Sequence, residues 1–439
     1  MTRYLSLFLL AFVLLSSCGV QRDTETGLRQ TTIRVAHFGG IHSTEIFDEI
    51  VGEWDKRHPR ITVKLERTVG DQYLTKLLTG YASGSAPDVC WVENHHMPAL
   101  FGKGALMPLN DFIASDPAIN VKDYWPEEIE RFTVNGRLFA LPNDTAPVAC
   151  IYYNKAAFDR AGLSYPRDNW DWDEFLRVAK KLTIFDEGGR VTQYGFAGWA
   201  WQSWIYSRGG RMVDDVQNPR KCLLAAPDAI AGLKFFFDLR LKHQVMPAPT
   251  EMSALGMDAT QMFSSGRVAM FNTGIWNASF FNKIKDFDWD IAMFPKYPGS
   301  DHARFATGGS GWGILKTTPH PREAWEVVKL MGGEQIQTRL AGTGNFQPAI
   351  MRLARSKDIW LKCPPKPANK QLLNGAVAYA IYDPFTHNWN EISDMVIQPE
   401  FDKVWLGRQS VEEAVARIAP RFEALLAEAR ADRPDSFQR

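Results

Sequence analysis

The feature that most constrains the fold is a regular alternation of strand and helix patterns at the start of the chain. Short runs rich in β-branched residues alternate with longer segments whose apolar side chains recur at helical spacing. In order, these strand, helix, strand, helix and strand patterns cover residues 32–36, 45–58, 61–65, 73–78 and 87–92. This order predicts a parallel α/β sheet, because a crossover helix returns the chain to the same end of the sheet.

Capping residues and turn residues mark several boundaries further along the chain. Asp171 is predicted to be a helix N-cap, with Glu174 three residues later completing a capping box. Ser410 opens the last helix in the same way, and Pro420 is expected to kink or break that helix. Gly136 indicates a tight hairpin turn.

The N-terminus has the pattern of an export signal. Arg3 precedes a short apolar run at residues 4–15, which is too short to span a bilayer comfortably, and small residues follow it. Cys18, after Leu-Ser-Ser and before glycine, resembles the lipidated cysteine of the bacterial lipobox. We predict a signal peptide at residues 1–17 and a lipid-anchored tether at residues 18–30. The alternative is an ordinary signal peptide with an incidental cysteine.

Composition narrows the class of protein that remains after export. Lys+Arg and Asp+Glu both number 50, so the formal net charge is zero and a nucleic-acid partner is not expected. About 420 residues remain after the leader, which predicts two or more structural units in a soluble body. The cysteines of this body, which lack metal-ligand spacing and leave disulfide pairing open, are Cys90, Cys150, Cys222 and Cys363.

Enzymatic and metal-binding motifs are missing from the sequence. It contains no nucleophile elbow, zinc-protease motif or phosphate-binding glycine loop. Asp171 and Asp173 look like a carboxylate pair, but an N-cap and a first-turn acid explain them better. Side chains adjacent in sequence are expected to point in different directions, so His95 and His96 are not predicted to bind a metal. The chain is therefore expected to be no enzyme and to need no cofactor.

A series of short motifs, weak singly but ordered and well spaced, resembles one known family. The motifs lie at residues 84–89, 106–112, 136–142, 151–155, 170–175, 263–270, 274–276, 307–312 and 321–325. Together they resemble the extracellular solute-binding proteins of ABC importers, in the sugar-binding group that includes maltose-binding protein. The resemblance covers nearly the whole mature chain.

The resemblance implies an α/β, two-lobed, periplasmic-binding-protein-like fold. Each lobe would be a mostly parallel sheet flanked by helices, and a multi-strand hinge would join the lobes around the ligand. Because Pro142 cannot extend a central strand, the chain is expected to be redirected there, with crossings near Asn143, Asp290 and Gly342. Lobe 1 is then predicted to be residues 31–142 and 291–342, and lobe 2 residues 143–290 and 343–439.

Several of the 15 tryptophans are candidates for the ligand site. Tryptophan can stack on the apolar face of a sugar while its N–H donates a hydrogen bond. The family carries an aromatic platform at the position of Trp276. Trp199 and Trp201 precede a glycine pair, and Trp312 is flanked by glycines. Core packing is the alternative for each of these side chains.

The polar candidates lie at strand ends and in loops. Glu93 and Asn94 follow the third strand pattern, at the edge where ligands sit in open α/β sheets, and they would bind sugar hydroxyls. His37 ends the first strand pattern, and Phe38 beside it is expected to be a packing residue. The other candidates are Asp144, Gly308, Gly309 and Asn345, followed by Arg304, Tyr382 and Gln347.

The resemblance implies a monomeric, extracytoplasmic receptor that hands a carbohydrate or polyol to ABC permease subunits. It would be held at the membrane by its lipid anchor. One alternative ligand is a glycerol phosphate or phosphodiester, which needs arginine or helix N-termini at the cleft. The alternative from another class is a secreted carbohydrate-active enzyme.

The lipobox hypothesis makes a prediction for Cys18→Ala. The variant loses the acylated thiol, so the protein should move from the membrane fraction to the soluble fraction while ligand binding is unchanged. Fractionation and calorimetry of wild-type and variant protein measure the two effects. A variant that stays in the membrane fraction contradicts the anchor.

Overall fold

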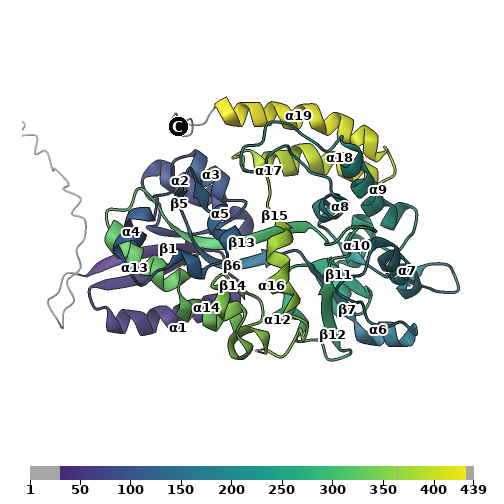
Figure 1. Ribbon diagram of the computed structural model, residues 1–439, viewed down its shortest axis with the longest axis horizontal. Coiled ribbons are helices and arrows are strands. Elements are labelled where there is room, and N and C mark those ends of the chain that lie inside the picture. The colour runs from purple at the N-terminus through teal and green to yellow at the C-terminus, as the bar shows by residue number, and fades with distance from the viewer. Residues whose placement is uncertain (1–29, 363, 432–439) are drawn as a thin grey trace, which may run out of the picture.

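Two α/β lobes lie side by side in the computed structural model, which describes residues 30–362 and 364–431 (Figure 1). Lobe 1 holds a seven-stranded sheet in the order β14-β6-β13-β3-β1-β2, with β15 (Ala380–Ile381) paired to β13. Lobe 2 holds a four-stranded sheet in the order β10-β11-β7-β12. The two-lobed α/β fold expected from the sequence is confirmed.

The N-terminal alternation forms the outer half of the lobe 1 sheet as predicted. Its elements are β1 (Thr31–His37), α1 (Ile41–Arg57), β2 (Ile61–Arg67), α2 (Gly70–Ser83) and β3 (Val89–Glu93). Strand β1 pairs in parallel with both β2 and β3. Phe47 and Ile50 of α1 are fully buried against this sheet, so the helical spacing of apolar residues places one face in the core.

Lobe 2 is built on short strands covered by helices. The strands are β7 (Cys150–Asn154), β10 (Ala197–Gly198), β11 (Met270–Thr273) and β12 (Trp289–Met293). The main covering helices are α7 (Trp172–Leu182), α8 (Trp201–Arg208) and α9 (Pro227–Leu241). Helix α7 begins as predicted, because Asp171 Oδ1 accepts the backbone N–H of Glu174 at 3.0 Å. The Asn135–Gly136 hairpin is also present, and both of its residues have positive φ.

Both sheets are mixed, so the expectation of mostly parallel sheets is wrong in that detail. Strand β6 (Leu141–Pro147) carries the chain out of lobe 1, and β13 (Phe305–Ile314) brings it back. These two strands therefore run antiparallel, and β13 is also antiparallel to β3. In lobe 2 the entering strand β7 pairs antiparallel with the leaving strand β12 for the same reason, and it is also antiparallel to β11.

The chain crosses between the sheets later than the sequence-based boundaries place it. The boundary at 142–143 falls inside β6, and the first crossing comes between Pro147 and Cys150. The boundary at 290–291 falls inside β12, and the second crossing follows Met293. The Asn272 side chain donates to the carbonyls of Val148 (3.2 Å) and Cys150 (3.1 Å), which fixes the first crossing at lobe 2.

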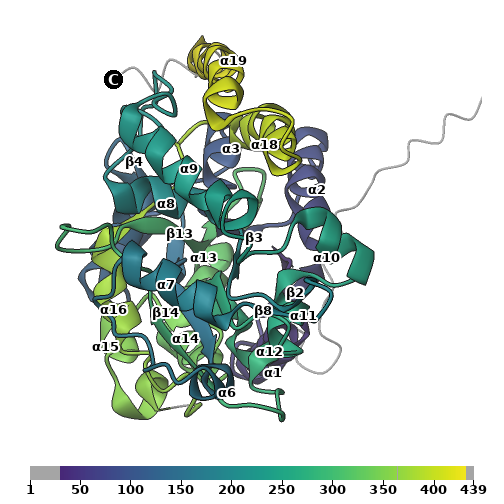
Figure 2. The same cartoon turned by 90° about the vertical axis from the view of Figure 1, so that its right-hand side faces the viewer.

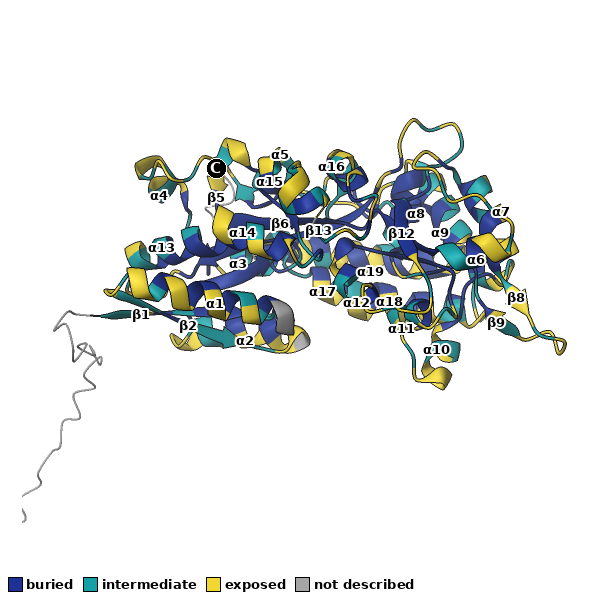
Figure 3. Ribbon diagram, turned by 90° about the horizontal axis from the view of Figure 1, so that it is seen from below, coloured by how far each residue is buried: buried dark blue, intermediate teal, exposed yellow. Residues whose placement is uncertain are grey.

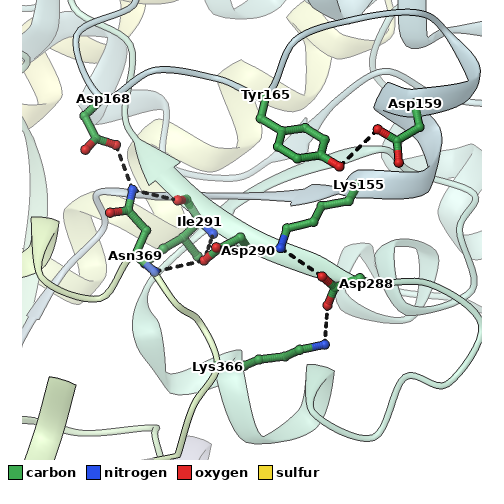
Figure 4. A network of polar contacts seen from close by, with 9 residues as sticks. All are labelled: Lys155, Asp159, Tyr165, Asp168, Asp288, Asp290, Ile291, Lys366 and Asn369. Carbon is green, nitrogen blue, oxygen red and sulfur yellow. Dashed lines mark hydrogen bonds and ion pairs between the residues drawn. The ribbon is translucent and has the colours of Figure 1, made fainter. Parts of the chain in front are cut away.

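The third crossing comes after β14 (Gln347–Pro348), which pairs with β6 in lobe 1, so the boundary at 342–343 is also too early. A polar network then ties the returning segment to lobe 2 (Figure 4). Asn369 N donates to Asp290 at 3.1 Å and its side chain to Asp168 at 2.9 Å. Lys366 pairs with Asp288.

Lys155 also contacts Asp288, at 2.8 Å. Although burial opposes it, the ammonium groups of Lys155 and Lys366 lower the pKa of Asp288 to about 2. The Asp288 carboxylate therefore stays charged throughout the neutral range. Asp288 therefore attaches the segment after the third crossing to lobe 2, because it pairs both with Lys366 of that segment and with Lys155 of lobe 2.

Two prolines do not interrupt their elements as expected. Pro142 lies within β6, where the pairing with β13 slips between Ser310 and Gly311, and a bulge is a position where a strand accepts proline. Pro420 lies inside α19 (Val411–Ala431), which continues through it. Both Pro420 and Ala416, whose carbonyl loses its helical N–H partner, are exposed, so water can satisfy that carbonyl.

The C-terminal helices α18 (Gln398–Trp405) and α19 complete lobe 2 by packing on α9 (Figure 2). The rings of Phe237 and Trp405 lie 4.6 Å apart at this contact. Each lobe has its own buried cluster of apolar side chains, as the buried strands of Figure 3 indicate. Within the described residues, no helix is long and apolar enough to cross a membrane.

The N-terminal expectations and one cysteine lie outside the described residues. These are the signal peptide, almost all of the tether with Cys18, and Cys363. The other cysteines, Cys90, Cys150 and Cys222, are free and buried. Burial raises the pKa of the Cys222 thiol to about 11. We therefore assign no disulfide among the three.

The close packing of α8 on α9 depends on Gly232. A Cβ atom at this position would lie 2.7 Å from the carbonyl oxygen of Trp204 and 2.8 Å from the backbone nitrogen of Ile205. Because backbone atoms cannot move aside cheaply, Gly232→Ala should lower the free energy of unfolding by about 1–3 kcal/mol. Urea unfolding measures the loss. The control is Gly375→Ala in α16 (Leu372–Ala376), where the added methyl meets no atom within 4 Å. Equal stability of the two variants would contradict the prediction.

Candidate functional site

A cavity of about 510 Å³ lies between the two lobes. Lobe 1 lines it with the end of β3, the middle of β6 and the start of β13, and lobe 2 lines it with the loop before α8 and the segment after β11. A larger hollow of about 800 Å³ is lined by lobe 1 alone, between α2 and the neighbouring strands. Another of about 740 Å³ surrounds the hairpin at residues 133–136. The interlobe cavity brings exposed aromatic rings of lobe 2 together with polar groups at strand ends of lobe 1, so it is the candidate site.

Two exposed tryptophans form the lobe 2 wall of the cavity. Trp199 is 49% exposed and Trp276 is 39% exposed, and their ring centroids lie 6.4 Å apart with the planes inclined by 40°. A Cβ atom on Gly274 would lie 1.8 Å from the Trp276 ring, so glycine is required for this ring position. Large apolar rings exposed in a cavity offer flat faces on which a ligand ring can stack.

The lobe 1 wall is polar and carries two neighbouring carboxyl groups. Asp144 is held by Ser310, whose backbone N–H donates to Asp144 Oδ1 at 2.9 Å and whose hydroxyl contacts the same oxygen. Burial raises the pKa of Asp144 to about 6. Burial, and then the charge of Asp144, raises the pKa of Glu93 to about 8. At neutral pH Glu93 can therefore donate a hydrogen bond as well as accept one.

His95 lies beside Glu93, with its Nδ1 atom 3.2 Å from Glu93 Oε2. Burial and the charge of Arg131 lower the pKa of His95 to about 4. Both partners are neutral at pH 7, so this contact is not an ion pair between charged groups.

Two sets of polar contacts join the lobes around the cavity. The buried guanidinium of Arg131 donates to the carbonyl of Asn94 at 2.7 Å and to the carbonyl of Asp383 at 3.3 Å. Asn345 accepts the backbone N–H of Ser279 at 2.7 Å and donates to its hydroxyl at 2.6 Å. Asn94, Asp383 and Asn345 all line the cavity, so these contacts set how far apart its walls stand.

Most of the candidate residues predicted from the sequence line this cavity. They are Glu93, Asn94, Asp144, Trp199, Trp276, Gly308, Gly309 and Asn345. A Cβ atom on Gly309 would come within 2.6 Å of Glu128 Oε2, so this glycine is needed for close packing beside the cavity. Their positions are consistent with a common site, while their roles as ligand contacts stay predictions.

Three candidates are not on the cavity. His37 is fully buried and packs edge-on against Phe47 at 5.3 Å, while Phe38, expected to be a packing residue, lines the cavity. Phe38 and not His37 faces the cavity because side chains that follow one another along a strand point to opposite faces. Trp312 is fully buried in the core of lobe 1. Trp201 packs against Phe401 at 5.0 Å and lines a separate hollow of about 200 Å³.

The weaker candidates also lie away from the lining. Gln347 is buried and donates to Asn374 at 3.1 Å, and Tyr382 stacks under the Arg131 guanidinium at 4.9 Å. Arg304 is not among the lining residues. Sequence reasoning did not propose as ligand contacts the lining residues Trp91, His95, Gln202, Ser310, Phe346 and Asp383, although Ser310 lies inside the motif at residues 307–312. Ser310 and Phe346 directly follow the predicted residues Gly309 and Asn345, so a prediction one residue further along the chain would have included them.

Comparison with known proteins identifies the class of molecule. The model of the bacterial extracellular solute-binding protein family matches residues 40–338. The arabinooligosaccharide-binding protein of Bacillus subtilis is 25% identical, over 81% of this chain and 82% of the relative. The sn-glycerol-3-phosphate-binding periplasmic protein of Salmonella paratyphi A is 23% identical, over 81% of this chain and 83% of the relative.

A solved structure has the same fold. The substrate-binding protein Lmo0181 of Listeria monocytogenes, determined in complex with cycloalternan, superimposes with a TM-score of 0.80 at 24% identity. The match covers 91% of this chain and 99% of that protein.

The raised pKa of Asp144 predicts how stability varies with pH. The folded value of about 6 lies above the ordinary value of 3.8, so the folded state holds this proton more tightly than the unfolded state. The contribution of Asp144 to stability should therefore fall as pH rises from about 4 through 6. Asp144→Asn keeps an acceptor for Ser310 but cannot ionise, and its stability relative to wild type should rise over that window by at most about 3 kcal/mol.

Chemical denaturation at a series of pH values measures this difference. Glu187→Gln, at an exposed glutamate, is the matched control and should show a constant difference from wild type. A constant difference for Asp144→Asn would show that the buried carboxyl is not perturbed.

Proposed function

The chain belongs to the bacterial extracellular solute-binding proteins, and from that premise we propose that it captures a carbohydrate for an ABC importer as a lipid-anchored receptor. The ligand class is inferred from one observation: an aromatic wall and a polar wall face each other across the cavity. Exposed indole rings of Trp199 and Trp276 stand on lobe 2, and hydrogen-bonding groups including Glu93 and Asn94 stand on lobe 1. A sugar presents apolar ring faces and polar edges, so it matches both walls at once.

Carbohydrate is a better fit than the glycerol-phosphate alternative. One relative is named for glycerol 3-phosphate, so this ligand is a genuine competitor. None of the residues lining the interlobe cavity is lysine or arginine, and Glu93, Asp144 and Asp383 bring carboxyl groups to it. A phosphate needs positive charge or free backbone N–H groups, and the Asp144 carboxylate, whose pKa of about 6 leaves it mostly ionised at pH 7, would repel it. We therefore place neutral sugars first.

Closure of the lobes would convert this cavity into an enclosed site. A ligand that contacts Trp276 on lobe 2 and Glu93 on lobe 1 favours the closed form by its contacts with both. Arg131 and Asn345 already bridge the lobes beside the cavity, and a closing motion would have to keep or exchange these hydrogen bonds. The crossing strands β6 and β13 would act as the hinge.

The anchor proposed at Cys18 would keep the receptor close to its permease. Residues 19–30 are polar and rich in Gly, Gln, Arg, Asp, Thr and Glu, a composition typical of a flexible tether. A tethered receptor meets the permease at an effective concentration set by tether length rather than by diffusion from solution. The permease subunits are therefore the proposed protein partner, with the receptor acting as a monomer.

A ligand panel tests the proposed class. Calorimetry and thermal shift on the purified protein should detect binding of at least one mono- or oligosaccharide or polyol. Glycerol 3-phosphate and a short peptide serve as the competing classes. Binding of the phosphate alone would overturn the carbohydrate assignment and leave the solute-binding class intact. Release of product from an oligosaccharide would instead indicate a carbohydrate-active enzyme.

Trp276→Ala should weaken carbohydrate binding, because the variant loses a stacking face without disturbing a core. We expect an increase in Kd of about tenfold or more, equivalent to at least ~1.4 kcal/mol. The matched control is Phe280→Ala, which removes a 43% exposed aromatic ring outside the cavity lining. Thermal unfolding of both variants should remain close to wild type. Unchanged affinity in Trp276→Ala would remove that ring from the ligand site.

A further inference from the structure

Two adjacent histidines converge with a glutamate at the edge of the cavity, contrary to the sequence-based expectation. The ring centroids of His95 and His96 lie only 4.1 Å apart. One ligand atom from each of Glu93, His95 and His96 lies within 4.8 Å of the others. The sequence argument failed because it assumed an extended backbone, in which neighbouring side chains point to opposite sides.

A tight turn at the end of β3 produces this convergence. The backbone N–H of His96 donates to the carbonyl of Glu93 at 3.0 Å, which folds residues 93–96 back on themselves. His96 then begins α3 (Met97–Gly102) with helical backbone angles. The Arg131 guanidinium holds the turn through the carbonyl of Asn94 at 2.7 Å. The three donors are therefore positioned by the fold and not by each other alone.

His96 has the environment of an oriented ligand. It is only 6% exposed, and its Nδ1 atom has no hydrogen-bond partner among the described residues. The rings of Phe38 and Tyr73 pack against it, each at 5.7 Å, and fix the plane of the imidazole. A buried imidazole nitrogen without a partner costs free energy unless something unseen satisfies it.

We propose that Glu93, His95 and His96 form a binding site for a divalent transition-metal ion such as Zn²⁺. Two imidazoles and one carboxylate are a donor set that zinc accepts with one coordination position left open. Imidazole favours zinc over magnesium or calcium, which prefer oxygen donors. Glu93 and His95 line the interlobe cavity, so an ion bound by them would lie beside the space where a solute would sit.

Two nearby charged groups have opposite effects on the binding of a cation at this site. Arg131 lies close enough to lower the pKa of His95, and its positive charge opposes a cation. Asp144 lies close enough to raise the pKa of Glu93, and its carboxyl favours a cation. The site therefore draws its affinity from the three donors and not from a strongly negative surrounding field.

Titration of the purified full chain with zinc chloride, after treatment with EDTA, tests the site. Calorimetry should show one ion per chain at low-micromolar Kd or tighter. Cobalt chloride as a spectroscopic probe should give the visible absorption of a low-coordinate cobalt–imidazole site. His96→Asn and Glu93→Gln should each weaken zinc binding at least about tenfold. Magnesium chloride and calcium chloride should not compete.

The matched control is His302→Asn, at an exposed histidine that stacks on Tyr379 outside the cavity. It should bind zinc as wild type does. If His96→Asn fails to fold, His95→Asn replaces it, because His95 is 36% exposed and tolerates substitution better. Absence of saturable zinc binding below ~100 µM, or equal binding by wild type and the Glu93 and histidine variants, overturns the proposal. Since no carbohydrate is used, neither result affects the proposed receptor function.

Discussion

The antiparallel pairing of β6 with β13 is the constraint on which the rest of the structure depends. One strand leaves lobe 1 and the other returns to it, so their hydrogen-bonded ladder joins the lobes and also forms part of the cavity wall. The bulge that admits Pro142 lies in this ladder, and Asp144, just beyond it, is bonded to Ser310 of β13. A change of register here would move the carboxyl group, the glycines of β13 and the hinge together.

The titratable groups of the cavity have shifted pKa values because the fold shields them from water. Burial raises the pKa of both Glu93 and Asp144, and it lowers that of His95. At neutral pH Glu93 and His95 are then uncharged while Asp144 is mostly ionised, which suits hydrogen bonding to hydroxyl groups better than the binding of an anion. The exposed tryptophans on the other lobe complete a surface that is half aromatic and half polar.

Local patterns in the sequence predicted the features that depend on neighbouring residues. The alternation over residues 32–92 gave the right strands and helices, Asp171 capped its helix, and Gly136 formed its hairpin. The errors have long-range causes. Pro142 was expected to end a strand that a bulge allows to continue, and Trp312 was placed at the cavity although it packs in the core. Which face of an element meets the cavity depends on partners hundreds of residues away.

By itself, the sequence determined the α/β class, the family resemblance and several of the polar and aromatic cavity residues, because motif order and strand ends depend on residues that are neighbours in the chain. Only the tertiary structure decided where the chain crosses between lobes, that Phe38 and not His37 faces the cavity, and that His95 and His96 converge with Glu93. These outcomes depend on a turn, a bulge and burial, which arise only when distant segments pack against one another.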